Sequence, residues 1–290
     1  MNIFNDSKMN DKARRQCLYE GSLFAYRPSP SSLQLCQLAR ELVDQAFSPL
    51  DPRKLHESLS ADRCAEVLAV VKPRFIHHPK SKEFIQGLLA ELGYDLEKTY
   101  FDVPRLRSAF PSDYLKSGIA YAFHPHRDTW YSAPLCQINW WMPVYPISQG
   151  NCMAVHPNYW EQPVKNGSKT YNYAQWNRES RQSAAAHVKT DTRVQPKPEE
   201  PLTLSPDLRL VCDVGGPYLF SAAQMHSTVP NQTNEARYSI DFRTVNIDDI
   251  WDGLGAPNVD SACSGTSLGD FIRASDLSPI PPEAVAIYDK

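Results

Sequence analysis

The sequence predicts a mostly β protein with flanking α-helices, in which an antiparallel sandwich or barrel forms the core. Before residue 100, three segments carry apolar residues at the three- and four-residue spacing of amphipathic helices. After residue 100, short runs rich in β-branched and aromatic residues follow one another without helical segments between them. Strands that do not alternate with helices favour an antiparallel arrangement. The 24 Pro residues, an above-average number, fit the many loops that short strands need.

The N-terminal region, residues 1–99, is expected to form a helical layer that packs on the core. Residues 1–30 are expected to be irregular. The apolar stripes predict three helices, at about 31–47, 61–71 and 81–92. Ser60 is expected to cap the second helix and Pro73 to end it, because proline lacks a backbone donor. Gly93 is expected to end the third, since glycine readily adopts the left-handed conformation of a helix C-terminus.

The core is expected over residues 100–250, as short strands bounded by Pro, Gly, Asn and Asp. The runs rich in β-formers are Tyr100–Leu106, Ile119–Phe123, Gln137–Val144, Cys152–Val155, Leu208–Val214, Tyr218–Phe220 and Arg237–Val245. A polar insertion at about 158–206 separates the fourth run from the fifth, and a loop of that length indicates a lid or a binding loop. Residues 251–290 form a C-terminal extension, and one structural domain is expected for the whole chain.

Composition argues against several classes of partner. A net charge of −3 offers no basic surface to nucleic acid or to an anionic membrane. Seven scattered Cys without a C-x-x-C pair are typical of reduced thiols. The chain has no run of about 18 apolar residues, and no apolar run follows the cationic residues near its start. We therefore expect a cytoplasmic protein that binds a small-molecule substrate, without nucleic acid or membrane partners; nothing in the sequence indicates its oligomeric state.

One pair of residues points to a metal site. His126 and Asp128 stand two apart, so in an extended segment both side chains leave the same face of the backbone. They can bind one metal ion at two adjacent coordination positions, and a distant part of the chain must supply the third ligand. By itself the pair is weak, because roughly one accidental match is expected in a chain of this composition.

The segment from Cys212 to Thr244 supplies the other half of the pattern. It contains His226 and then a run that starts at Arg237, in which polar and apolar residues alternate. Alternation places one set on each face of a strand. The polar set is Arg237, Ser239, Asp241 and Arg243, and the apolar set is Tyr238, Ile240 and Phe242. If the apolar face packs on the helices, the polar face lines the interior, where buried guanidinium groups need an anion such as a dicarboxylate.

These residues together resemble the iron(II)- and 2-oxoglutarate-dependent dioxygenases: His126-x-Asp128, then His226, then Arg237 eleven residues later with Ser239 beside it. Gly150–Pro157 resembles the strand and turn that the phytanoyl-CoA dioxygenase-like group carries between the two halves. The run from Gly215 through His226, Asn231 and Arg237 resembles the closing motif of the same group. The resemblance covers about residues 100–246.

The resemblance implies a double-stranded β-helix, the jelly-roll core that cupins share. It implies Fe(II) held by His126, Asp128 and His226, with 2-oxoglutarate and O2 as cosubstrates. Arg237 would pair with the far carboxylate of 2-oxoglutarate, with Ser239 and Thr228 hydrogen bonding to it. The implied reaction hydroxylates or otherwise oxidises an unactivated C–H bond of a small molecule, with release of succinate and CO2. Halogenating relatives have Gly or Ala in place of the aspartate, so Asp128 indicates an oxygenase.

Three other interpretations stay open. His124 could join His126 in a cupin-type site, although no Glu follows within residues 129–134. The spacing of Arg237 and Arg243 is similar to the close of AlkB-like nucleic-acid demethylases, which the acidic net charge opposes. A catalytically silent jelly-roll that binds a ligand is the third. The remaining histidines are expected in loops or at the surface: His56, His77, His78, His156 and His187.

The strand that follows the His-x-Asp pair presents two different faces. Gln137, Asn139 and Trp141 alternate with Ile138, Trp140 and Met142, and either face can be the interior one. If the polar face is interior, Gln137 and Asn139 would contact cosubstrate. The candidate substrate-pocket residues are Trp130, Tyr131, Trp141, Arg243 and Tyr121. Further aromatic residues are divided between packing and pocket wall: Tyr145, Tyr159, Trp160, Tyr171, Tyr173 and Trp176.

Overall fold

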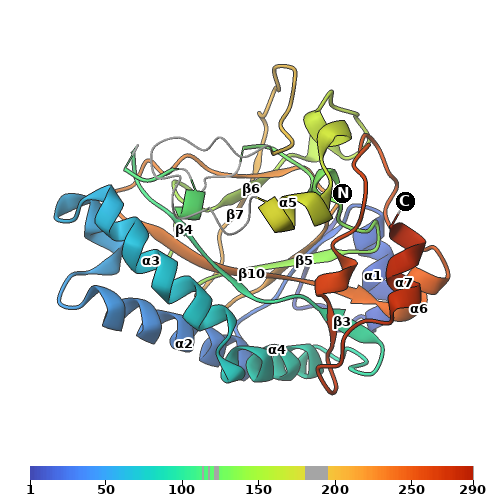
Figure 1. Cartoon of the computed structure of the whole chain (residues 1–290), viewed down its shortest axis with the longest axis horizontal. Coiled ribbons are helices and arrows are strands. Elements are labelled where there is room, and N and C mark those ends of the chain that lie inside the picture. Colours follow the sequence, from blue (N-terminus) through green and yellow to red (C-terminus); the bar gives the residue numbers. More distant parts are fainter. Residues whose placement is uncertain (113, 117, 121–123, 180–194, 290) are drawn as a thin grey trace.

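Two β-sheets form the core of the computed structural model, which describes residues 1–112, 114–116, 118–120, 124–179 and 195–289 (Figure 1). The strands are β1 (Ile3–Asn5), β2 (Leu23–Ala25), β3 (Thr99–Phe101), β4 (Arg105–Ala109), β5 (Ile138–Pro143), β6 (Met153–Val155), β7 (Leu208–Leu210), β8 (Tyr218–Ser221), β9 (His226–Thr228), β10 (Arg237–Asn246) and β11 (Ile272–Arg273). The larger sheet has the order β1-β2-β8-β5-β10-β3-β11, and β4 also pairs with β10. The smaller sheet has the order β7-β6-β9.

The strand order is that of a jelly-roll. In the larger sheet, β8, β5, β10 and β4 lie side by side, and every one of these pairings is antiparallel. In the smaller sheet, an isolated antiparallel bridge between His126 and His226 adds the segment around His126 next to β9. The chain thus passes repeatedly from one sheet to the other, as in two Greek keys. The predicted jelly-roll core is confirmed.

Helices cover the outer face of the larger sheet. The helices are α1 (Asp11–Tyr19), α2 (Pro30–Phe47), α3 (Ala61–Ile76), α4 (Pro79–Glu91), α5 (Tyr173–Glu179), α6 (Ile247–Trp251) and α7 (Pro282–Tyr288). Short 3-10 turns lie at Pro52–Glu57, Gly118–Ala120, Asp128–Tyr131, Pro157–Tyr159, Gly167–Thr170 and Leu268–Asp270. In Figure 1, α2, α3 and α4 lie on one side of β5 and β10, with β6, β7 and α5 on the other. The apolar face of β10 (Tyr238, Ile240, Phe242) joins one buried cluster with these helices, as alternation predicted.

The N-terminal 30 residues correct the expectation of an irregular segment, because they contain β1, α1 and β2. β2 pairs with β8, and Phe24 lies opposite Leu219. In α1, Arg15 forms a buried ion pair with Asp249 at 2.6 Å, and Tyr19 donates a hydrogen bond of 2.7 Å to the same carboxylate. All these partners lie far along the chain, so local sequence patterns carry no sign of them.

The helix boundaries differ from the predicted ones at two points. Ser60 caps α3 as predicted, but the helix continues through Pro73 to Ile76. Phe75 in this last turn is fully buried, and burial of its ring offsets the backbone hydrogen bond that proline cannot make. α4 begins at Pro79, slightly before the predicted start, and ends at Glu91; Gly93, two residues later, has the predicted left-handed conformation (φ +72°).

Two predicted strands also need correction. The run Tyr100–Leu106 is divided into β3 and β4, since residues 102–104 pass through Pro104 out of the ladder. The predicted strand Ile119–Phe123 begins instead in the 3-10 turn Gly118–Ala120, and residues 121–123 lie outside the described residues. In the described part of the chain, no helix has the length and apolar character needed to cross a membrane.

Candidate metal centre

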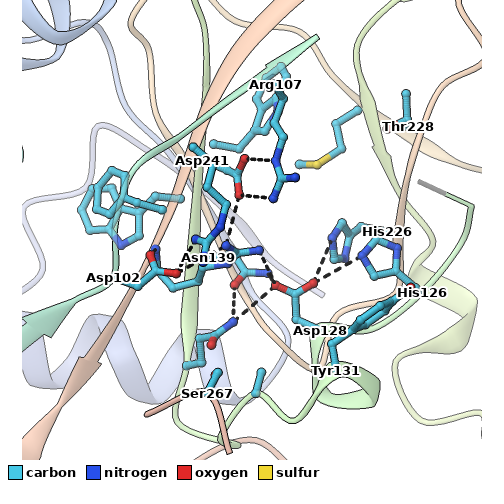
Figure 2. A pocket seen from close by; sticks show the side chains of 18 of the residues that line it. Asp102, Arg107, His126, Asp128, Tyr131, Asn139, His226, Thr228, Asp241 and Ser267 are labelled. Atoms are coloured by element: carbon cyan, nitrogen blue, oxygen red, sulfur yellow. Dashed lines mark hydrogen bonds and ion pairs between the residues drawn. The ribbon is translucent and has the colours of Figure 1, made fainter. Parts of the chain in front are cut away.

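Three buried side chains converge at one end of the smaller sheet. The Nε2 atom of His126 lies 3.3 Å from Oδ1 of Asp128, and Nε2 of His226 lies 3.7 Å from the same oxygen (Figure 2). The possible ligand atoms of the three residues all lie within 4.8 Å of one another. This spacing lets one metal ion contact all three atoms, and the predicted ligand set is therefore brought together by the fold.

Backbone pairing sets this geometry. The N–H of His126 donates to the carbonyl of His226 at 3.0 Å, and the N–H of His226 donates back to the carbonyl of His126 at 3.0 Å. The N–H of Asp128 donates to the carbonyl of Ala222 at 2.9 Å. Residues about a hundred positions apart in the chain are thereby held opposite one another.

The two imidazoles are oriented for metal binding. Nδ1 of His126 lies 2.8 Å from the carbonyl oxygen of His124, and Nδ1 of His226 lies 2.9 Å from that of Gln224. A carbonyl only accepts hydrogen bonds, so each Nδ1 carries the proton and each Nε2 keeps its lone pair. Burial, together with the nearby His126 ring, lowers the pKa of His226 to about 3, which keeps this ring neutral. Neutral rings with outward Nε2 lone pairs are ready-made metal ligands.

Asp128 presents only one oxygen to the histidines. Its Oδ2 accepts hydrogen bonds from Asn139 at 3.0 Å and from Gln137 at 3.3 Å, and it lies 3.5 Å from Nη2 of Arg243. Burial alone would raise the pKa of Asp128, but the charge of Arg243 helps to lower it below its usual value. The carboxylate is therefore ionised, and Oδ1 is left for a metal.

We expect Asn139→Ala to lower the affinity for Fe(II) by roughly 10- to 100-fold, because outer partners orient a ligating carboxylate. The measurement is anaerobic titration with Fe(II). Gln86→Ala is the control, since the Gln86 side chain donates instead to the carbonyl of Ala274. Unchanged Fe(II) affinity in Asn139→Ala would contradict an orienting role for this amide.

Arg127, between the two ligands, anchors the segment to the C-terminal region. Its buried guanidinium pairs with Asp260 at 3.1 Å and donates to the carbonyls of Ala223 (2.6 Å), Gln162 (3.0 Å) and Tyr159. Asp260 also accepts a hydrogen bond of 2.7 Å from Nε1 of Trp130. Trp130 is fully buried beside Met225, so it belongs to the packing of this region rather than to the cavity wall where it was predicted.

We expect Asp260→Ala to lower the free energy of unfolding by about 3 kcal/mol or more, because the buried guanidinium of Arg127 loses its counter-charge. Denaturant unfolding measures this change. The matched control is Asp252→Ala, at an exposed position, which should change the free energy of unfolding by less than about 0.5 kcal/mol. Equal stability of the two variants would show that Asp260 is not an anchor.

A cavity of about 370 Å³ adjoins the three ligands and is lined by both sheets. Gln137, Asn139 and Trp141 line this cavity, whereas Ile138 and Met142 lie in the apolar core. The face with the polar residues is therefore the interior one, although Trp140 of the core also reaches the lining. Of the predicted pocket residues, Tyr131, Trp141 and Arg243 line the cavity. Tyr121 lies outside the described residues. The amides of Gln137 and Asn139 are engaged with Asp128, and contact between them and a cosubstrate stays a prediction.

Two buried polar atoms of β10 lack a partner among the described residues, and one of them belongs to Arg237, which lines the cavity. Arg237 donates from Nη1 to the carbonyl of Cys152 at 3.0 Å, but its Nε has no acceptor. The hydroxyl of Ser239, on the same face of β10, is fully buried and also unpartnered. Burial lowers the pKa of Arg237 to about 10, which still leaves the side chain charged at neutral pH. Unsatisfied buried donors of this kind are costly unless an anion binds to them, and Thr228 lies on the same cavity wall.

A charge network that the sequence analysis missed forms another part of the wall. Asp241 accepts from Nε of Arg107 at 2.6 Å and lies 3.4 Å from Arg243, which is also 3.4 Å from Asp102 (Figure 2). Alternation along β10 had placed Asp241 on the interior face. The same alternation applied to Arg105 and Arg107 on β4 would have found their cavity-facing guanidinium groups.

The insertion contributes an aromatic wall. Tyr171, Tyr173 and Trp176 line the cavity together with Tyr131, whose ring lies 5.4 Å from that of Tyr171. The other flanking aromatic residues pack elsewhere: Tyr145, Tyr159 and Trp160. The described part of the insertion also contains α5, so it is not a structureless loop.

None of the other described histidines belongs to the cluster of three possible ligands. Nε2 of His124 lies 2.8 Å from the carbonyl oxygen of Pro196, and this ring is not part of the group of possible metal ligands found among the described residues. His156 lies in the loop after β6, as predicted, but it is buried and hydrogen bonds to Ser227 at 2.9 Å. His187 lies outside the described residues.

Comparisons with known proteins give distant structural likenesses only. No family model matches the chain, and no curated protein matches it. Among solved structures, the chain is similar to EvdO2 from Micromonospora carbonacea var. aurantiaca complexed with 2-oxoglutarate, at 14% identity over 82% of this chain and 91% of that one, with a TM-score of 0.45. It is also similar to the epimerase SnoN in complex with Fe3+, alpha ketoglutarate and nogalamycin RO (15%, 82% and 85%, TM-score 0.40) and to the non-heme monooxygenase ThoJ (15%, 74% and 68%, TM-score 0.37). The function proposed below comes from the side chains of this chain.

Proposed function

We propose that this protein is an iron(II)- and 2-oxoglutarate-dependent oxygenase that acts on a small molecule. One observation carries the proposal: two imidazole Nε2 atoms and one carboxylate oxygen converge in a cavity whose wall also holds the unsatisfied guanidinium of Arg237. Two histidines and one carboxylate on one face of an octahedron are typical of non-haem Fe(II) oxygenases, since three positions stay open for cosubstrate and oxygen.

The donors in the cavity fit both groups. His126, Asp128 and His226 would hold Fe(II) through Nε2, Oδ1 and Nε2. A dicarboxylate that chelates the metal with one end needs a cationic partner for the other. Arg237 lines the cavity and has an unsatisfied donor among the described residues, as does Ser239, two residues along the same strand. When bound, iron and 2-oxoglutarate would supply, with O2 as the oxidant, the chemistry that attacks an unactivated C–H bond, and succinate and CO2 would be the co-products.

The residues of this chain position the metal ligand and the substrate and exclude water from the site. Asn139, Gln137 and Arg243 hold Oδ2 of Asp128, so the carboxylate stays a one-oxygen ligand and the other metal positions stay open. Tyr131 and the aromatic side chains of the insertion form an apolar wall that can seat the substrate beside the metal and keep out water. We propose hydroxylation as the outcome, which requires that the substrate C–H be held next to the metal.

Anaerobic addition of Fe(II) and 2-oxoglutarate to the purified protein tests the assignment. The expected result is a weak visible charge-transfer band, which appears only when both are present. On admission of oxygen, 2-oxoglutarate should be converted to succinate. Absence of the band would overturn the proposal. A band without succinate formation, in the presence of candidate substrates, would instead indicate a silent binding protein.

A further inference from the structure

The charges that line the cavity do not balance. Among the described residues, the lining side chains include the cations Lys72, Arg105, Arg107, Arg237 and Arg243 and the carboxylates Asp102, Asp128 and Asp241. If the proposed function holds, Fe(II) and the dianionic 2-oxoglutarate cancel each other in charge. The loaded cavity therefore keeps an excess of positive charge, and a buried excess of this kind favours an anionic ligand.

One of these cations stands out because it has no carboxylate partner among the described residues or in the proposed cosubstrate. Arg105 pairs with Asp102, Arg107 pairs with Asp241, and Arg243 lies near three carboxylates. Arg237 is the proposed partner of the cosubstrate. Lys72 remains, and no carboxylate of the described residues lies within ion-pair distance of its ammonium group among the contacts found.

Lys72 is buried, and the hydrogen bonds that its ammonium group makes to described residues go to neutral acceptors. The side chain comes from α3, which packs against β4, and the residue is 8% exposed. Its Nζ donates to the hydroxyl of Ser108 at 3.2 Å and to the carbonyl of Ile119. An ammonium group has three donors, so these two contacts leave one for a ligand. Burial, together with the charge of Arg107, lowers the pKa of Lys72 to about 7, as expected for an ammonium without a counter-charge.

We propose that the substrate carries an anionic group, a carboxylate or a phosphate, and that Lys72 binds it. The position of Lys72 in the same cavity as the metal ligands and the aromatic wall places this contact within one binding site. The substrate class is then a small molecule with an apolar body, seated on the aromatic wall, and one anionic end. This inference rests on the proposed function and narrows it.

The test measures binding of simple probes to the anaerobic protein loaded with Fe(II) and saturating 2-oxoglutarate. The probes are phenylacetate and phenyl phosphate, with neutral benzyl alcohol as the matched compound, and binding is followed by calorimetry. At least one anion should bind more tightly than the alcohol by roughly 10- to 100-fold, the value of a hydrogen bond to a charged group. If neither anion binds more tightly than the alcohol, the inference is overturned.

The variant Lys72→Gln separates recognition from structure, because its amide can still donate to Ser108 and Ile119 but carries no charge. It should lose the preference for the anion while its affinity for benzyl alcohol and its unfolding midpoint stay as in the parent protein. Lys80→Met, an exposed lysine of α4, should change nothing. Retention of the anion preference in Lys72→Gln would overturn the assignment to Lys72.

The charge-transfer band separates a failure of the proposed oxygenase function from a failure of the role assigned to Lys72. A band that persists during the titration shows that the anion does not displace 2-oxoglutarate. If the band forms but anions bind no more tightly than the alcohol, the inference about Lys72 is overturned and the proposed function stands. If the parent protein shows no band, the proposed function itself is overturned.

Discussion

Replacement of Asp128 by alanine should abolish turnover. Oδ1 of this carboxylate is the only anionic atom in the cluster of possible ligands, and it lies 3.3 and 3.7 Å from the two Nε2 atoms. Its loss leaves two neutral imidazoles and removes the charge that a divalent ion needs. The effect should exceed the roughly 10- to 100-fold that loss of an outer partner costs. Succinate formation and the anaerobic charge-transfer band should both fall below detection.

The experiment needs chloride-free buffer, because a small residue at this position leaves room for an anion next to the metal. Asp62→Ala, in the first turn of α3, serves as the control and should keep full activity. The unfolding midpoint of Asp128→Ala should stay close to that of the parent protein, which excludes loss of fold as the cause. Succinate formation at the parental rate by Asp128→Ala would be incompatible with a metal ligand at this position.

Replacement of Arg237 by glutamine should weaken binding of 2-oxoglutarate by about 2–5 kcal/mol, roughly 30-fold to several thousandfold, the usual cost of removing one partner of a buried charge pair. The guanidinium is buried, its Nε has no acceptor among the described residues, and the ring of Trp141 lies 5.6 Å from its central carbon. The concentration of 2-oxoglutarate that gives a half-maximal charge-transfer band measures the effect. Affinity for Fe(II) alone should stay unchanged, because Arg237 is not among the possible ligands.

Arg237→Lys should fall between the parent protein and Arg237→Gln, since lysine keeps the charge but loses the planar pair of donors. Arg63→Gln, at the exposed start of α3, is the control. If half-saturation by 2-oxoglutarate is the same in Arg237→Gln as in the parent protein, the cosubstrate carboxylate lies elsewhere. Ser239 would then have no role as its companion.

Local patterns were enough to predict several parts of the molecule. The period of the apolar residues predicted α2, α3 and α4, and period-two alternation predicted that the charged side chains of β10, Arg237, Asp241 and Arg243, line the cavity. These patterns arise because backbone geometry places residues at fixed spacings on one face of a helix or strand, and that face is buried. Residues close together in the sequence are therefore enough to reveal them. The His-x-Asp pair was visible for the same reason, because its two ligands lie on one short segment.

Long-range pairing decided what local patterns could not show. β1, α1 and β2 exist because of partners such as Leu219 and Asp249, far along the chain. Trp130 looked like a pocket residue beside the metal ligands, yet the carboxylate of Asp260 draws its ring into the packing around Arg127. Gln137 and Asn139 could be placed on a face from sequence, but only the fold showed that their amides hold Asp128.

The sequence by itself determined which residues could bind a metal and an anion, because ligand chemistry resides in side-chain type and short spacing. The tertiary structure decided which of these candidate residues lie close together. His226 reaches Asp128 through reciprocal backbone hydrogen bonds with His126, and Lys72 reaches the cavity from a helix whose stripe looked purely apolar. These arrangements depend on contacts between residues that are remote in sequence. Bringing such residues together costs chain entropy, which is offset only when the whole core packs.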